Sequence, residues 1–203
     1  MSKLSVGIVN YGVGNLASVR HCLQALDFRC RVSDDNAVLS SCDLLLLPGV
    51  GAFPLAMKAL QARGLDRYLI EQSAQGRPLL GICLGMQLLT DVSYEGGLTR
   101  GLGLIPGEVV SLGQGSWHIG WNAAEKVATS PLFDLDGGDS FYFNHSYVYR
   151  GADEYQLCRT RFDCNFASMI GKGNTVGIQF HPEKSQIAGR TLLQKIVRRL
   201  CDA

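Results

Sequence analysis

The sequence lacks the features that mark several classes of protein. Its net charge is only +1 over 203 residues, so nothing suggests a surface dedicated to nucleic acid or membrane. No segment approaches the length of a membrane span, and the N-terminus has no long apolar stretch of the signal-peptide kind. The seven cysteines form no Cys-x-x-Cys pair, which disfavours disulfides and zinc. We therefore expect a cytoplasmic protein without metal or cofactor, and with neither nucleic acid nor membrane as a partner.

The sequence also has no internal repeat and no low-complexity linker. Its hydrophobic content of 46% and its charged content of 18% are those of a globular protein. The length is sufficient for a substantial core, and we expect residues 1–203 to form a single domain.

Apolar segments alternate with helical patterns in the first half of the chain, which predicts a parallel sheet with right-handed crossovers. The expected strands there are Leu4–Val9, Arg29–Ser33, Asp43–Leu47 and Leu79–Cys83, and the expected helices are Leu16–Leu26, Pro54–Leu60, a further stretch to Ala74, and Leu84–Asp91. After about Leu102 the pattern predicts shorter strands at Val109–Val110, Phe141–Phe143, Tyr147–Tyr149, Phe166–Ile170 and Thr175–Phe180, and then a helix at Gly189–Leu200. The predicted fold class is α/β with three layers, a mixed, mostly parallel central sheet with flanking helices.

Cys83 lies in the most informative segment, where an apolar run enters Gly-Ile-Cys-Leu-Gly and a helical pattern follows. The glycines two residues before and two after it leave room for a sharp, strained turn of the nucleophile-elbow kind. Such a turn exposes the thiol above the N-terminal end of the next helix, where a thiolate is favoured. The alternative is a small buried hydrophobe, as expected for the other six cysteines. A catalytic thiol needs a base, so the choice depends on the rest of the chain.

His181 and Glu183 supply a candidate base and the group that would orient it. In an extended segment, residues two apart point the same way, and Pro182 favours an extended residue before it. His181 would deprotonate Cys83 and later protonate a leaving amine, while Glu183 would hold the imidazole tautomer. By itself the segment also fits an ordinary loop with a solvated glutamate.

Acyl chemistry further requires hydrogen-bond donors for an oxyanion. The backbone N–H of Leu84, directly after the candidate nucleophile, is one predicted donor. A second could come from Pro48–Gly51, because its glycines allow backbone N–H groups to face a ligand. The alternative for this segment is a turn that only ends a strand.

Two other patterns suggest different chemistry. Gly12-x-Gly14-x-x-Ala17 follows the first expected strand, with Asp34 and Asp35 about twenty residues on, which matches the dinucleotide-binding fingerprint. That interpretation leaves Cys83 and the His-Pro-Glu segment without a role. The histidines at 118, 145 and 181 could be grouped as metal ligands, but their spacing matches no familiar ligand pattern.

The segments Gly-Ile-Cys-Leu-Gly-Met-Gln and Gln-Phe-His-Pro-Glu-Lys-Ser together resemble the class I, triad-type glutamine amidotransferases. Further motifs are similar to those of the glutaminase subunits of imidazole glycerol phosphate synthase, over essentially the whole chain. These motifs are Asn10–Leu16, Pro48–Phe53, His118–Asn122, His145–Tyr147 and His181–Gln186.

The resemblance implies that Cys83, His181 and Glu183 form a triad that hydrolyses L-glutamine through a thioester. It implies oxyanion donors at Val50 and Leu84, with the Val50 peptide requiring reorientation before the oxyanion hole is complete. Ammonia would pass to a (β/α)₈-barrel cyclase that makes imidazole glycerol phosphate and an aminoimidazole carboxamide ribotide for histidine biosynthesis. The implied substrate-binding residues are Gly49, Gly51, Gln87, His145, Ser146 and Tyr147, and the implied partner-interface residues are Asn15, Trp121, Asn122, Tyr142 and Lys184.

One departure from the family pattern is visible. The segment before His118 is Gly115-Ser116-Trp117, where the resemblance leads us to expect something nearer Val-Pro. Two further hypotheses stay open beside the dinucleotide-binding module. One is the same glutaminase feeding another synthase, such as one that amidates sugars for surface polysaccharide. The other is a thiol hydrolase or peptidase of a related elbow-cysteine fold.

Overall fold

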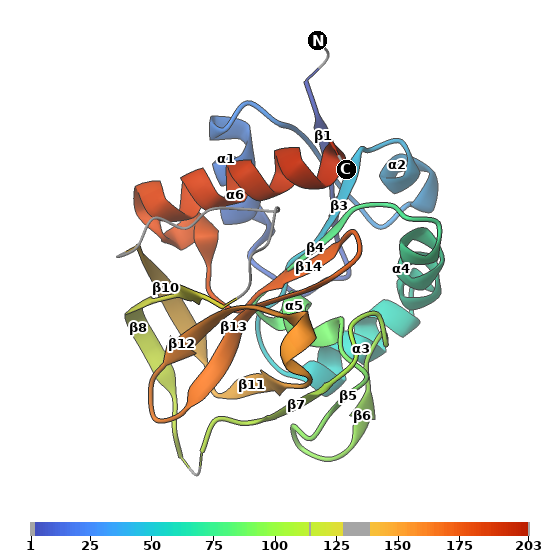
Figure 1. The fold of residues 1–203 in the computed structure, drawn as a ribbon. Coiled ribbons are helices and arrows are strands. Elements are labelled where there is room, and N and C mark those ends of the chain that lie inside the picture. The colour runs from blue at the N-terminus through green and yellow to red at the C-terminus, as the bar shows by residue number, and fades with distance from the viewer. Residues whose placement is uncertain (1–2, 114, 128–138, 203) are drawn as a thin grey trace.

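The computed structural model describes residues 3–113, 115–127 and 139–202, and its ribbon is shown in Figure 1. A large sheet crosses the molecule in the order β2 (Arg29–Ser33), β1 (Ser5–Val9), β3 (Leu44–Leu47), β4 (Leu79–Ile82), β14 (Thr175–Ile178), β13 (Asn165–Lys172), β11 (Tyr147–Arg150), β7 (Glu108–Ser111), β5 (Val92–Ser93) and β6 (Thr99–Arg100). Beside this path, β12 (Gln156–Arg161) pairs with β13 and with β9 (Glu125–Lys126), and a separate pair joins β8 (His118–Ala123) to β10 (Ser140–His145).

The first five strands of that order are all parallel, whereas β13, β11 and β7 follow in antiparallel pairs. Both faces of a parallel sheet are usually covered by helices, so its strands appear in the sequence as unbroken apolar runs. In β3 all four leucines are buried. Leu44 and Leu46 join one hydrophobic cluster and Leu45 and Leu47 join another, as the twofold alternation of a strand requires.

The two clusters lie under two layers of helices. One cluster includes buried side chains of α1 (Leu16–Ala25) and α6 (Gln186–Cys201). The other includes side chains of α2 (Asn36–Ser40), α3 (Phe53–Gln61), α4 (Leu65–Ala74) and α5 (Leu84–Leu88). In Figure 1 α1 and α6 lie together on one side of the parallel strands, and α2, α3 and α4 lie on the other. The predicted three-layer α/β architecture is confirmed.

Several boundaries differ from the prediction, and the differences have local causes. The helix after Cys83 ends at Leu88 instead of Asp91, because the chain turns to pair with the 101–105 segment: Leu102 N–H donates to Leu88 O at 2.9 Å and Leu104 N–H to Leu89 O at 2.8 Å. The final helix begins earlier, at Gln186, after a 3₁₀ turn, η2 (Pro182–Lys184). The elements α2, β8 and β12 were not predicted, and neither was a second 3₁₀ turn, η1 (Asp153–Tyr155).

Asp35 shows why α2 was missed. Its carboxylate accepts a hydrogen bond from Ala37 N–H at 2.7 Å and so caps a helix of only five residues. In the sequence, Asp34 and Asp35 draw attention only as part of the match to the dinucleotide-binding fingerprint.

Among the residues described, no helix combines the length and the apolar character needed to cross a membrane.

The sheet brings the candidate catalytic segments to one edge. Strands β4 and β14 are neighbours in register, with Ile82 opposite Ile178, and Cys83 N–H continues the ladder by donating to Ile178 O at 2.7 Å. Strand β3 pairs with β4 on its other side, with Leu47 opposite Gly81. The carboxyl ends of three adjacent parallel strands therefore deliver Pro48–Gly51, Cys83 and His181 to the same place, where ligands of open α/β sheets bind.

Candidate active site

Cys83 forms a strained turn between β4 and α5. Its backbone has φ 54° and ψ −114°, a conformation that residues with a side chain rarely adopt. The flanking glycines make the turn possible. A Cβ atom at Gly81 would lie 2.6 Å from Gly85 O, and a Cβ atom at Gly85 would overlap the carbonyl oxygen of Leu47. The Gly-x-Cys-x-Gly pattern thus reflects close backbone packing on both sides of the thiol.

This packing predicts that Gly85→Ala destabilises the protein by about 3 kcal/mol or more, because the new methyl group meets backbone that cannot move aside. The matched control is Gly113→Ala, where the nearest atom is the end of a flexible side chain, Ser116 Oγ at 2.9 Å. Urea unfolding of both variants measures the effect. A Gly85→Ala variant as stable as Gly113→Ala would contradict this account of the elbow.

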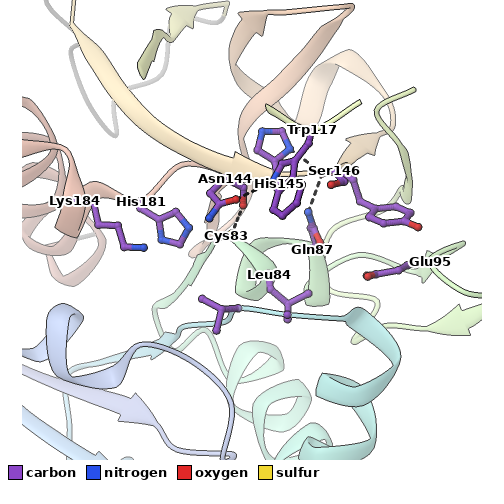
Figure 2. Close-up of a pocket in the computed structure, with 13 residues that line it drawn as sticks. Cys83, Leu84, Gln87, Glu95, Trp117, Asn144, His145, Ser146, His181 and Lys184 are labelled. Carbon is purple, nitrogen blue, oxygen red and sulfur yellow. Dashed lines mark hydrogen bonds between the residues drawn. The ribbon is translucent and has the colours of Figure 1, made fainter. Parts of the chain in front are cut away.

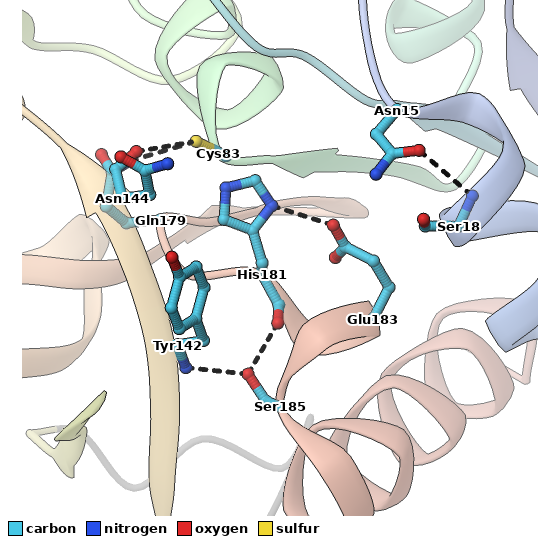
Figure 3. Close-up of polar contacts among 9 residues, drawn as sticks. All are labelled: Asn15, Ser18, Cys83, Tyr142, Asn144, Gln179, His181, Glu183 and Ser185. Atoms are coloured by element: carbon cyan, nitrogen blue, oxygen red, sulfur yellow. Dashed lines mark hydrogen bonds and ion pairs between the residues drawn. The ribbon is translucent and has the colours of Figure 1, made fainter. Parts of the chain in front are cut away.

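His181 and Glu183 form a buried pair. His181 Nδ1 lies 2.9 Å from Glu183 Oε1, and the two side chains are 4% and 1% exposed. The histidine backbone is fixed from both sides: its N–H donates to Tyr142 O at 2.8 Å, and its carbonyl accepts from Ser185 Oγ at 2.6 Å. Figure 3 shows the imidazole between Cys83 and Glu183. The geometry is that of a base held by a carboxylate, with the other ring edge facing the thiol.

Burial by itself would lower the pKa of His181. Interactions with Cys83 and Glu183 oppose this effect, and the net result is a pKa well above the ordinary value of 6.5. An imidazole with such a pKa is protonated at neutral pH, so a positive charge lies beside the sulfur of Cys83.

We predict that Glu183→Gln lowers the pKa of His181, because a neutral amide no longer favours the imidazolium. Protonation of His181 stabilises the wild type fully below pH 6.5, and this stabilisation disappears as pH rises through the raised pKa. The variant should therefore lose stability at neutral and mildly alkaline pH.

Nitrogen NMR of the imidazoles measures this shift directly, since the chain has only four histidines. Glu125→Gln, which neutralises an exposed carboxylate on β9, is the control and should leave the His181 titration unchanged. An unchanged or higher pKa of His181 in Glu183→Gln would show that the carboxylate does not act on the ring.

A cavity of about 260 Å³ opens beside the thiol. The residues that line it include these predicted catalytic, oxyanion and substrate-binding residues: Val50, Gly51, Cys83, Leu84, Gln87, His145, Ser146, Tyr147 and His181. Lys184, predicted at the partner interface, lines it as well. Three further lining residues were not predicted, namely Glu95, Trp117 and Asn144 (Figure 2). The volume suits a ligand of amino-acid size, and the lining combines a nucleophile with polar groups of both kinds.

Gly49 is a predicted site residue that does not line this cavity. It packs beneath it, where a Cβ atom would lie 2.8 Å from both Leu84 Cβ and Tyr11 Oη. Tyr11 also donates its hydroxyl to Pro48 O at 2.7 Å. The first half of Pro48–Gly51 is therefore fixed in place, whereas Gly51 has φ 94° and a Cβ atom there would meet nothing within 4 Å.

The unpredicted lining residues had no motif to mark them. Glu95 lies in the loop between β5 and β6, and its carboxylate accepts a hydrogen bond from Phe53 N–H at 2.8 Å. Trp117 belongs to the segment that departs from the family pattern. It is 61% exposed, and its indole N–H donates to Asn144 Oδ1 at 2.8 Å. Glu95 and Trp117 therefore line the cavity because their loops pack against segments that are distant in the sequence.

His118 and His145 face each other across the β8–β10 pair, with their rings 3.1 Å apart from Nδ1 to Nε2. His145 Nδ1 lies 3.0 Å from Tyr147 O, and because a carbonyl only accepts, this nitrogen carries the proton. His118 must then donate from Nδ1, which leaves its Nε2 to accept from Asn122 Nδ2 at 3.3 Å. Burial lowers the pKa of both rings, to about 3 for His145.

These contacts account for the three histidines that were considered as metal ligands. His118 and His145 are neutral partners of each other, and His181 pairs with Glu183. Within the described ranges, no group of three or more His, Cys, Asp or Glu side chains is arranged to hold a metal ion.

The predicted interface residues differ in exposure and in their contacts, and of the five only Lys184 lines the cavity. Trp121 is 50% exposed and packs edge-on against the half-buried Tyr142, with ring centroids 6.2 Å apart. Lys184 Nζ lies 5.7 Å from the Tyr142 ring centroid. Asn122 is turned inward, since its amide contacts His118 and donates to Arg161 O at 2.9 Å. The side chain of Asn15 accepts from Ser18 N–H at 3.3 Å and caps α1.

The glycines of the dinucleotide-like pattern have another role. Gly12 and Gly14 have φ of 86° and 128°, and a Cβ atom at Gly14 would lie 3.6 Å from the Pro48 side chain. This loop thus packs against Pro48–Gly51, which carries a predicted oxyanion donor.

Comparison with known proteins agrees with this geometry. The family model described as glutamine amidotransferase class-I matches residues 8–199. The chain is 47% identical over 199 residues to imidazole glycerol phosphate synthase subunit HisH of Symbiobacterium thermophilum, covering 96% of this chain and 94% of the relative. It is 43% identical over 193 residues to the protein of the same name from Moorella thermoacetica, covering 93% and 92%.

Solved structures with the same fold include that of PurLQS from Thermotoga maritima, with a TM-score of 0.77 and 21% identity over 98% of this chain and 100% of that one. Another is a glutamine amidotransferase from the same organism, with a TM-score of 0.68 and 16% identity over 100% of both chains. At these identities the likeness establishes the fold. The family match over residues 8–199 and the relatives at 47% and 43% identity show that the chain belongs to the class-I glutamine amidotransferase family and is a glutamine-hydrolysing enzyme.

Proposed function

We propose that this protein is the glutaminase subunit of an imidazole glycerol phosphate synthase, in which Cys83, His181 and Glu183 form the catalytic triad. The observation that carries the triad is the buried His181–Glu183 pair beside a cysteine held at φ 54°. The relatives that share 47% and 43% identity over nearly their whole length bear the name of that subunit.

The proposed reaction begins with attack of the Cys83 thiolate on the side-chain carbonyl carbon of L-glutamine. The imidazolium of His181 protonates the departing amine, so ammonia leaves and a glutamyl thioester remains. His181, now neutral, takes a proton from water as the water attacks the thioester. Glutamate is released, and the thiolate and imidazolium are restored. Glu183 holds the ring tautomer and stabilises its positive charge throughout.

Both tetrahedral intermediates carry an oxyanion that needs preorganised donors. We assign these to the backbone N–H groups of Leu84 and Val50, whose residues both line the cavity beside Cys83. Leu84 is fixed at the start of α5, whereas Val50 lies in a loop and is 39% exposed.

The rest of the cavity supplies groups for the amino-acid end of glutamine. Both amide hydrogens of Gln87 are directed inward, to Tyr147 O at 3.0 Å and to Gln179 Oε1 at 3.1 Å. Gln87 therefore offers the cavity only its carbonyl oxygen, an acceptor. That oxygen and the Glu95 carboxylate suit the α-ammonium group of the substrate. Gly51, Ser146 and Tyr147 line the part of the cavity wall that is available to the rest of the glutamine.

Ammonia is proposed to pass to a (β/α)₈-barrel cyclase in a heterodimer. Tyr142 contacts both the exposed Trp121 and Lys184, and Lys184 also lines the cavity. Aromatic residues are enriched at protein interfaces, which supports this surface as the docking site. Asn15 and Asn122 stay predictions for that interface. We also propose the cytoplasm as its location, where its seven unpaired cysteines would stay reduced.

Reconstitution with such a cyclase tests the proposal. Mixing the two subunits should give glutamine-dependent formation of imidazole glycerol phosphate. Chromatography of the products measures this formation. Glutamine hydrolysis without transfer to that cyclase, but with transfer to a sugar-amidating synthase, would replace the histidine-pathway assignment and leave the glutaminase intact.

A further inference from the structure

Gln179 is a buried polar side chain that the mechanism above does not use. It follows β14 directly and is 0% exposed. Since Ile178 lies opposite Ile82 in the β14–β4 ladder, the next residues on the two strands are Gln179 and Cys83. The side-chain nitrogen of Gln179 is 3.9 Å from Cys83 Sγ, within hydrogen-bond range for sulfur (Figure 3).

The orientation of this amide is determined by its neighbours. Tyr147 O can only accept, so the atom of Gln87 that lies 3.0 Å from it must be the amide nitrogen. That same nitrogen is 3.1 Å from Gln179, which must therefore present its oxygen. The remaining atom of the Gln179 amide, the one that faces the sulfur, is the nitrogen. Exchanging the two atoms of the Gln179 amide would place its NH₂ group against that of Gln87, and exchanging those of Gln87 would place its oxygen against two acceptors, Tyr147 O and Gln179 Oε1.

The sulfur consequently lies between one acceptor and one donor. Cys83 Sγ is 4.0 Å from the backbone carbonyl of Asn144, which suits the neutral thiol as an S–H donor. A carbonyl oxygen this close opposes a negative charge on sulfur, whereas the N–H of Gln179 favours it. The two groups thus act in opposite directions on ionisation of the thiol.

We propose that Gln179 is a further active-site residue, which donates its amide N–H to the Cys83 thiolate, stabilises the charged form and keeps the sulfur directed at the cavity. Gln87 positions Gln179 for this task. The inference rests on the proposed role of Cys83 as nucleophile and adds a third group, besides His181 and the oxyanion donors, that acts on the reacting atoms.

The test measures how fast iodoacetamide alkylates Cys83 in the purified protein, by mass spectrometry of the Cys83 peptide over a range of pH. Gln179→Met has similar volume but no donor, and it should slow alkylation about tenfold at neutral pH. The deficit should shrink as pH rises, because the thiol then ionises with or without a hydrogen-bond donor. A merely structural effect would slow the reaction equally at every pH.

Ser168→Ala is the matched control. Ser168 is also 0% exposed and its carbonyl accepts from Gln179 N–H at 2.9 Å, but its hydroxyl takes no part in these contacts. It should react at the wild-type rate. Gln179→Asn, whose amide is one methylene too short to reach the sulfur, should behave like Gln179→Met and serves if the methionine variant fails to fold.

The outcomes separate this inference from the proposed function. Wild-type alkylation rates in folded Gln179 variants, or a deficit independent of pH, would overturn the role of Gln179 and leave the triad standing. If a glutamine-analogue diazo-ketone labels the wild type elsewhere and spares Cys83, the proposed nucleophile itself is wrong.

Discussion

Replacing Cys83 by alanine should reduce glutamine hydrolysis by about 10⁴-fold or more, while the protein stays folded. No other group can form the thioester, since His181 and Glu183 are bound to each other and the remaining lining residues offer no comparable nucleophile within the described cavity. The fold should survive because alanine differs from cysteine by one sulfur atom. Its removal also relieves no backbone strain, since alanine must adopt the same φ of 54°.

Cys83→Ser is a stricter version of the experiment. It keeps a hydrogen-bonding atom at the same place but replaces a group that ionises readily with a hydroxyl that does not. If the thiolate–imidazolium pair is the working form, serine should be nearly as damaging as alanine. Activity is followed as glutamate released per enzyme with the cyclase present.

The matched control is Cys158→Ala, which removes an equally sized thiol from a fully buried position on β12. This variant should keep wild-type activity. Substantial glutamine hydrolysis by Cys83→Ala would show that the elbow cysteine is not the nucleophile. Loss of hydrolysis in a folded Cys158→Ala variant would also contradict the assignment.

The sequence predicted those parts of the site that lie next to each other along the chain. The glycines around Cys83 are two residues away, and Pro182 separates His181 from Glu183, so both arrangements follow from local backbone geometry. Continuous apolar runs likewise indicated β1, β3 and β4. In each case the physical cause acts within a few residues, which is the range that a pattern can describe.

The parts that could not be predicted depend on pairing between distant segments. His118 meets His145 because β8 and β10 pair with those two residues opposite each other. Gln179 meets Cys83 because β14 inserts beside β4, 96 residues apart along the chain. Residue type did not indicate either contact, because the sequence alone does not show whether a glutamine or a histidine is buried or which residue it meets.

The polar residues beneath the cavity form one connected group, and this explains their burial. Leaving a buried amide or imidazole unpaired is costly, so each must find a partner of complementary kind. His145 and Gln87 both donate to the same carbonyl, Tyr147 O, and Gln87 extends the contact to Gln179. These hydrogen bonds connect the side chains beneath the cavity into one network.

The loop Pro48–Gly51 is the part of the wall most able to change. Tyr11 holds the carbonyl of Pro48, and Gly49 is wedged against Leu84 and Gly85. Beyond that anchor, Val50 is 39% exposed and the space around Gly51 is open. Rotation of the peptide between Gly49 and Val50 would redirect the Val50 N–H, and the exposed Val50 side chain and the open space at Gly51 leave room for it. This peptide is the natural place for a switch that directs a backbone N–H toward or away from the oxyanion.

We therefore expect the isolated protein to be a poor glutaminase and the cyclase to raise its kcat by about 10²–10³, the usual cost of one missing oxyanion donor. The effect should appear in kcat more than in KM, because the donor acts on the charge that develops during reaction. Steady-state hydrolysis with and without the cyclase measures both constants. A partner-free protein that already works at the rate of the complex would contradict the switch.

Interface variants show whether activation passes through the proposed surface. Trp121→Ala should weaken activation by the cyclase, because it removes a large exposed ring that packs against Tyr142 on the proposed surface. Ile70→Ala removes an apolar side chain of 40% exposure from α4 and should leave activation unchanged. Ammonia released before an acceptor is bound would be lost. An enzyme whose oxyanion hole is completed only by its partner avoids that loss, since the thioester then forms only where its product can be used.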